Sequence, residues 1–230
     1  MARVLSGELK IPNSVQTIGD YAFLGEYDGN QISKLIFESN SKLETIGNSS
    51  FSNNKLSGEL KIPASVTEIG QSAFLGENDG TTNRISKLTF EDDSKLETIG
   101  ISAFMQNSIE GVLILPDKVK IINASAFGNN NIEKLYLGSQ LEYLGNYSFG
   151  GNNSLQTVKI DMTETDSLPS VNKVTIADAE EYFEDLGLEY NIDYKDSRYE
   201  KATGRRSNKI VKEEPEEEEN IIEEDEEDTN

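Results

Sequence analysis

Residues 60–74 read LKIPASVTEIGQSAF, and residues 9–23 read LKIPNSVQTIGDYAF. The two stretches place the same apolar residues at the same spacing. Self-similarity at a period of about 20 to 50 residues indicates a repeat architecture. In such an architecture each unit contacts its neighbours, and the stacked units share one core.

Every copy of this pattern carries an aliphatic residue five positions before a phenylalanine. The pairs are Ile18/Phe23, Ile46/Phe51, Ile69/Phe74, Ile99/Phe104, Ile122/Phe127 and Leu144/Phe149. Successive phenylalanines are 28, 23, 30, 23 and 22 positions apart. The longer spacings reflect insertions that recur in alternate units, so residues 5–55 and 56–107 are two copies of a two-repeat block.

An alternating apolar pair precedes each of these motifs and predicts a short strand with one buried face. The pairs are Leu9/Ile11, Leu35/Phe37, Leu60/Ile62, Leu88/Phe90, Leu113/Leu115, Leu135/Leu137 and, in degenerate form, Val158/Ile160. Stacked strands would lie about 4.8 Å apart. We therefore expect a curved solenoid with a parallel sheet on one face and turns or short helices as returns. The first residues of the pairs should form one internal column and the six Phe rings another.

The pattern L-x-I-P…S-V…I-G-x-x-A-F resembles the BspA-type (Treponema-type) leucine-rich repeat, and six to seven units of it cover residues 5–160. The resemblance implies a leucine-rich-repeat fold, found in bacterial surface and secreted proteins that bind host proteins or other cells. It implies no catalytic residues. An export signal and a wall anchor, which a surface protein would need, are not evident in these residues.

Composition excludes several classes of function. The chain contains no Cys and no His, which removes thiol nucleophiles, zinc–thiolate sites and the commonest general base. We expect no cofactor and no enzymatic activity. The formal net charge is −21, and residues 1–194 contribute 14 bases against 28 acids, which argues against nucleic-acid binding. No apolar run approaches the roughly 20 residues that a transmembrane helix needs.

The predicted domains are the repeat solenoid at 1–160, a C-terminal cap at 161–194 and a disordered tail at 195–230. Asp178 and Glu181 form a capping pair before an amphipathic stretch that ends at Gly187, which indicates a helix. That helix either covers the last repeat or binds a partner. The tail has seven bases in 195–212 and twelve carboxylates in 213–230, and blocks of like charge do not fold alone.

A partner would bind the face on which the outward residues of the strands form a column. The predicted ligand-binding residues on this concave face are Ile36, Thr89, Val112, Ile114, Tyr136 and Lys159. An exposed apolar cluster that includes Tyr is typical of an interface centre, although packing against neighbouring strands is the alternative. A second column alternates in charge at Glu8, Lys34, Glu59 and Lys87, which predicts cross-strand ion pairs.

Two loops, at 24–30 and 75–83, combine Glu, Asp and Asn, the oxygen ligands that calcium prefers. The spacing lacks the EF-hand pattern, and Asp-Gly is above all a turn signal, so we predict no metal site. Asp92 and Asp93 form a carboxylate pair of the kind that acid–base catalysis uses. They stand at a repeat insertion with no accompanying nucleophile, so a glycosidase function is a weaker interpretation than a binding function.

We therefore expect a non-catalytic binding module, a segment of a bacterial surface or secreted adhesin that recognises a protein or cell-surface ligand. Localisation would be the cell surface in a longer parent protein, or the cytoplasm if the chain is complete. The alternative is an intracellular scaffold whose acidic tail binds basic partners.

Overall fold

A computed structural model describes residues 4–25, 29–77, 80–138 and 140–160 of the chain. Within these ranges the protein is a β-solenoid without helices. The predicted cap at 161–194 and the predicted tail at 195–230 lie outside the described residues.

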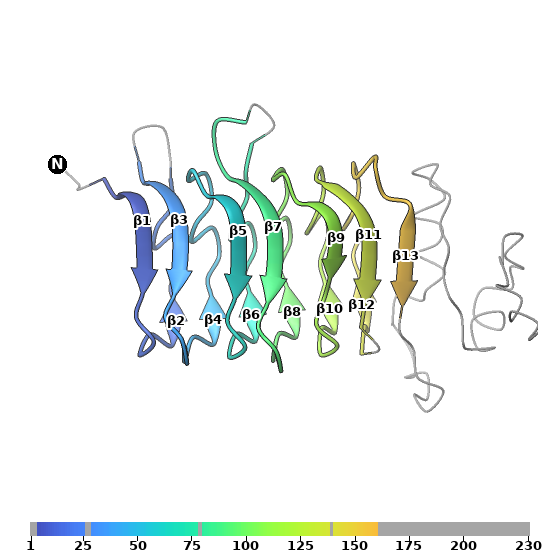
Figure 1. Ribbon diagram of the computed structural model, residues 1–230, viewed down its shortest axis with the longest axis horizontal. Coiled ribbons are helices and arrows are strands. Elements are labelled where there is room, and N and C mark those ends of the chain that lie inside the picture. The colour runs from blue at the N-terminus through green and yellow to red at the C-terminus, as the bar shows by residue number, and fades with distance from the viewer. Residues whose placement is uncertain (1–3, 26–28, 78–79, 139, 161–230) are drawn as a thin grey trace, which may run out of the picture.

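Each coil of the solenoid contains one long and one short strand (Figure 1). The long strands fall on the alternating apolar pairs, as predicted: β1 Ser6–Ile11, β3 Gln31–Phe37, β5 Ser57–Ile62, β7 Arg84–Phe90, β9 Glu110–Ile114, β11 Asn131–Leu137 and β13 Thr157–Ile160. The short strands end on the aliphatic residue of each Phe motif: β2 Thr17–Ile18, β4 Thr45–Ile46, β6 Glu68–Ile69, β8 Thr98–Ile99, β10 Ile121–Ile122 and β12 Tyr143–Leu144. We predicted one strand per repeat, so the short strands are an addition to that prediction.

The continuous sheet of the molecule is made by the short strands. They form one six-stranded parallel sheet in the order β12-β10-β8-β6-β4-β2. The long strands, which we expected to form a single sheet, form three: β1-β3, β5-β7 and β9-β11-β13. The two breaks follow β3 and β7, whose coils carry two extra residues before Ile46 and Ile99.

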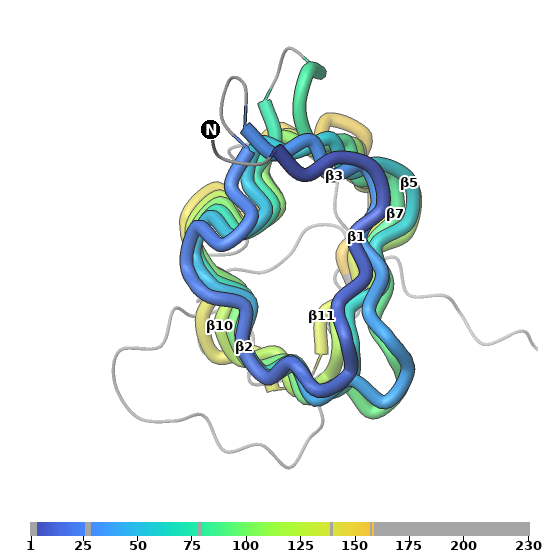
Figure 2. Tube along the Cα trace, turned by 90° about the vertical axis from the view of Figure 1, so that its left-hand side faces the viewer, coloured from blue at the N-terminus to red at the C-terminus, as the bar shows by residue number. Residues whose placement is uncertain are grey.

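The coils stack almost in line, so that they superpose when viewed along the solenoid axis (Figure 2). The layer of long strands forms one side of each coil, and the short strands lie across from it (Figure 2). This layer, from β1 to β13, is called the long-strand face below. It runs nearly straight in these views rather than as the curved, concave surface that we expected (Figures 1 and 2).

Two apolar columns fill the interior, and both were predicted. The first residues of the strand pairs are buried from Leu35 to Val158, whereas Leu9 in the first coil is only partly buried. The six Phe rings stack in sequence with centroids 5.1 to 5.4 Å apart and interplanar angles of 1° to 9°. Aromatic pairs of this kind stabilise a core beyond the area that they bury.

Hydrogen bonds join successive coils on both sides of the solenoid. On the short-strand side the strands pair in parallel, which exchanges bonds in both directions, and Gly47 N–H, just after β4, donates to Ile18 C=O of the coil before it at 2.8 Å. On the turn that follows, each coil donates to the coil after it, as Phe23 N–H does to Ser50 C=O at 2.8 Å. Every internal coil therefore donates hydrogen bonds to both neighbouring coils and accepts hydrogen bonds from both.

Buried asparagine side chains close these turns, and our sequence analysis missed them. Asn130 is 4% exposed; its amide oxygen accepts from Ile109 N–H at 3.0 Å, and its amide nitrogen donates to Phe104 and Phe127 C=O, each at 3.0 Å. Asn54, Asn83, Asn107 and Asn152 likewise accept a backbone N–H and donate to the Phe carbonyl of the coil before. For all but Asn152, the signal was an Asn two positions before an aliphatic residue, for example in Asn107-Ser108-Ile109.

Replacing Asn130 with Ala should destabilise the protein by about 3 kcal/mol, because several buried backbone groups lose their partners at once. The adjacent Asn131 is the matched control, since its side chain is exposed and Asn131→Ala should change stability by less than about 0.5 kcal/mol. Urea unfolding monitored by circular dichroism measures both. Equal effects of the two substitutions would contradict the structural role of the buried asparagines.

Glycine follows the aliphatic residue because successive coils meet there. A Cβ at Gly100 would lie 2.5 Å from the backbone nitrogen of Gln71, whereas a Cβ at Gly19 in the first coil would meet nothing within 4 Å. Gly100→Ala should therefore destabilise the protein by about 1 to 3 kcal/mol through overpacking. Gly19→Ala should leave the melting temperature nearly unchanged, and a similar loss in both variants would refute the explanation by close approach.

Candidate binding face

The predicted binding residues divide among the three long-strand sheets. Ile36 on β3 and Thr89 on β7 are half-buried and lie in separate sheets. Ile114, Tyr136 and Lys159 are register partners across β9, β11 and β13. Of Lys159 the structure describes only the backbone. The six residues thus do not form one row, because the breaks after β3 and β7 separate Ile36, Thr89 and the residues of the third sheet.

Val112 and Ile114 are the apolar residues most exposed on the long strands. Their exposed fractions are 53% and 62%, and they stand two positions apart on β9. Tyr136, the register partner of Ile114, is half-buried beside it, and Lys134 is the register partner of Val112. Val112, Ile114 and Tyr136 are called the apolar patch below.

The positions equivalent to Val112 and Lys134 in the duplicated blocks are charged and paired. Lys34 contacts Glu8 at 3.2 Å, and Lys87 contacts Glu59 at 3.4 Å, which confirms the predicted cross-strand pairs within each sheet. Among the described residues no ion pair joins Lys34 to Glu59, which lie on either side of the first sheet break. All four side chains are at least half exposed, so each pair contributes little to stability.

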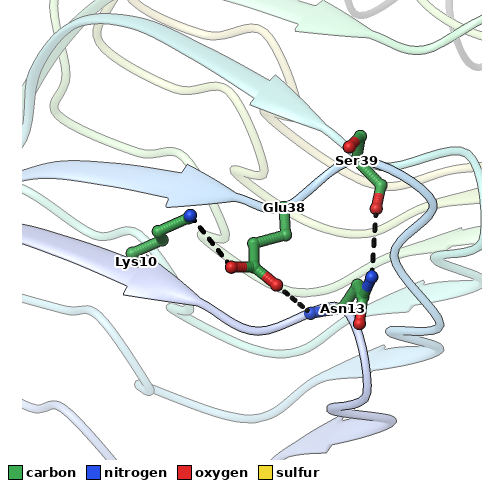
Figure 3. A network of polar contacts seen from close by, with 4 residues as sticks. All are labelled: Lys10, Asn13, Glu38 and Ser39. Carbon is green, nitrogen blue, oxygen red and sulfur yellow. Dashed lines mark hydrogen bonds and ion pairs between the residues drawn. The ribbon is translucent and has the colours of Figure 1, made fainter.

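Two glutamates of this face have pKa values held below the ordinary glutamate value. The pKa of Glu59 is lowered first by a hydrogen bond from the Thr89 hydroxyl at 3.0 Å and then by Lys87. The pKa of Glu38 is lowered first by Lys10, which lies 2.9 Å away, and then by the N–H of Asn13 at 3.0 Å (Figure 3). The Asn13 side chain reaches the Ser39 carbonyl at 3.5 Å, so the turns after β1 and β3 are joined (Figure 3).

Six further exposed apolar residues, all outside the long strands, were not predicted, and three of them lie in equivalent turns. Tyr21 is 62% exposed, Tyr147 is 64% exposed and Ile101 is 46% exposed. Each lies in the turn between the aliphatic residue and the Phe of its coil, away from the long-strand face. The two unspecified positions of I-G-x-x-A-F were the available signal, because these residues need not pack in the core. They stand singly in different coils, as isolated exposed apolar residues often do.

The predicted loop turns at 24–30 and 75–83 are only partly described, since residues 26–28 and 78–79 lie outside the described ranges. In the ranges that are described, no group of three or more acidic residues could hold a metal ion. Asp92 and Asp93 are exposed, and Asp93 has a φ of +58° in the turn after β7. These same ranges contain no helix that is long and apolar enough to cross a membrane.

A comparison with known protein families agrees with the repeat pattern found in the sequence. The chain is similar to the family of BspA-type leucine-rich repeat regions over residues 5–93 and 80–171, with six copies of the repeat. Among solved structures it is similar to the crystal structure of the pneumococcal vaccine antigen PcpA, with 20% sequence identity and a TM-score of 0.44. That match covers 84% of this chain and 69% of the other. A comparison with curated proteins found no match.

Replacing Lys10 with Met should raise the pKa of Glu38 toward the ordinary glutamate value of about 4.3, because Lys10 is the main cause of the lowering. Glu59 is the internal control, since Thr89 and Lys87 set its pKa. Carboxyl carbon NMR titration measures both groups. The Glu38 carboxylate should stabilise the fold above the unfolded-state pKa, and this contribution should vanish as pH falls through the folded-state pKa. An unchanged Glu38 titration in Lys10→Met would contradict the assignment.

Proposed function

Because this chain belongs to the family of BspA-type leucine-rich repeats, we propose that it is a non-catalytic binding module that recognises a protein ligand through its long-strand face. The solenoid holds the strands in fixed register, so the face offers an ordered surface without any change of shape. Preorganised surfaces lose little conformational entropy on binding.

The apolar patch carries this proposal. Val112 and Ile114 place exposed aliphatic side chains beside Tyr136 on a face whose other outward positions are mostly charged. Interface centres are enriched in Tyr and depleted of charged residues, and polar residues surround them. Lys134 adjoins the patch and has no ion-pair partner among the described residues. A ligand with an apolar centre and a neighbouring carboxylate would match this arrangement.

A binding role agrees better than catalysis with the composition of the face. The chain has no Cys or His, and its adjacent carboxylates Asp92 and Asp93 lie exposed in a turn. Acid–base catalysis needs carboxyl groups whose pKa values are set by burial and by neighbours. Glycoside hydrolysis, the remaining carboxylate chemistry, would require two such groups on either side of a substrate.

We further propose that the parent protein acts at the cell surface or outside the cell, as the family resemblance implies. The ligand would then be a host protein or a protein on another cell. This finer assignment rests on the repeat type alone, and it is separable from the binding role of the apolar patch.

The proposal is tested with the immobilised full chain, incubated with extracellular matrix proteins and serum proteins, with captured partners identified by mass spectrometry. Each partner is then titrated at two salt concentrations against wild type and against the double variant Ile114→Lys and Tyr136→Lys. Loss of two central contacts should weaken binding by about 100-fold. The double variant Tyr21→Lys and Ile101→Lys is the matched control, because it changes an exposed tyrosine and an exposed isoleucine away from the long-strand face.

Binding that tolerates salt and fails in the double variant would support the long-strand face as the site. Unchanged affinity in the double variant would contradict it. Binding that collapses at the higher salt and is lost when residues 195–230 are removed would assign recognition to the charged tail instead.

A further inference from the structure

The apolar patch lies near the point where the chain leaves the described part of the solenoid. Ile114, Tyr136 and Lys159 are register partners across β9, β11 and β13. Adjacent strands are about 4.8 Å apart, so the segment that follows Ile160 starts about 10 Å from Ile114. This segment therefore begins close to an exposed apolar surface on the same sheet.

Residues 178–187 are the part of that segment for which the sequence predicts an amphipathic helix. The stretch contains five carboxylates and no base, and the apolar side of the predicted helix would consist of Ala179, Tyr182, Phe183 and Leu186. Isolated helices shorter than about 12 residues are marginal in water, so this side needs a surface to pack against. The preceding residues 161–177 include Val171, Val174 and Ile176 and remain available to cover the last coil.

Lys134 gives the apolar patch a charge that matches this stretch. It is the register partner of Val112 and has no ion-pair partner within the described ranges, whereas its copies Lys34 and Lys87 contact glutamates. Carboxylates beside the apolar side of 178–187 would supply the missing partner. A segment with an apolar centre and flanking carboxylates is thus complementary to the apolar patch in both respects.

We propose that residues 178–187 bind the apolar patch of the same chain, with their two aromatic side chains on the exposed aliphatic side chains of β9. Residues 161–177 span about 55 Å when extended, which exceeds the distance to be bridged. A tethered segment acts at an effective concentration of about millimolar. The small apolar area of the patch therefore suffices for a contact within one chain.

The contact regulates the site of the proposed function. A protein ligand must displace residues 178–187 from the apolar patch, so its apparent affinity falls in proportion to the fraction of chains whose patch is free. This consequence rests on the proposed function, whereas the contact itself does not. The two are therefore tested separately.

The contact is tested by methyl NMR on the full chain with one nitroxide label at Glu184→Cys, which is specific because the chain has no other cysteine. Glu184 is far from the apolar side of the predicted helix, so the label should leave the contact intact. It should broaden the methyl signals of Ile114 more than those of Ile101, which lies away from the long-strand face. Equal broadening at the two isoleucines overturns the proposal.

Substitutions identify the groups that make the contact. The double variant Tyr182→Lys/Phe183→Lys should abolish the selective broadening, whereas Tyr190→Lys changes an aromatic residue outside the stretch and should preserve it. Lys134→Glu should weaken the contact, and Lys87→Glu is its matched control, because Lys87 has a glutamate partner on its own sheet. Broadening that does not respond to Lys134→Glu would indicate that the stretch covers the last coil instead, which overturns the proposal.

The regulation is tested with a protein ligand captured by the full chain. The double variant Tyr182→Lys/Phe183→Lys should bind this ligand at least about fivefold more tightly than wild type, and Tyr190→Lys should bind it as wild type does. If the contact is present but no ligand binds at the apolar patch, the proposed function fails and the contact stands. If a ligand binds at the patch with the same affinity in wild type and in the double variant, the regulation is overturned.

Discussion

The structure depends on hydrogen bonds between successive coils, because no coil can satisfy its own turn. Each buried asparagine accepts a backbone N–H from the preceding coil and donates to Phe carbonyls, as Asn107 does with Ile85 and Phe74. A buried turn with unpaired backbone groups would be costly. The asparagine side chain removes this cost at the position where the Phe column and the long strands meet. The stacked aromatic rings and the hydrogen bonds of the turns are thus satisfied together at this position.

The duplicated blocks show which parts of a coil tolerate change. The copies at 5–55 and 56–107 keep the apolar columns and the paired glutamates and lysines of the long-strand face. The later coils keep the columns but replace the paired charges with Val112 and Ile114. The surface therefore changes character between β7 and β9, where the long-strand layer also breaks. Interior stacking fixes the scaffold, and each outward position is free to serve recognition.

The sequence alone determined the repeat, its period, the long strands and the two apolar columns, because burial imposes a fixed spacing on apolar residues such as Leu60, Ile69 and Phe74. It also predicted the exposed position of Ile114 and the Glu8 and Lys34 pair, since residues beside a buried column must point outward. Tertiary structure decided what spacing does not encode. The short-strand sheet, the breaks after β3 and β7 and the burial of Asn130 depend on how neighbouring coils meet, and a hydrogen bond between coils leaves no apolar pattern in either one.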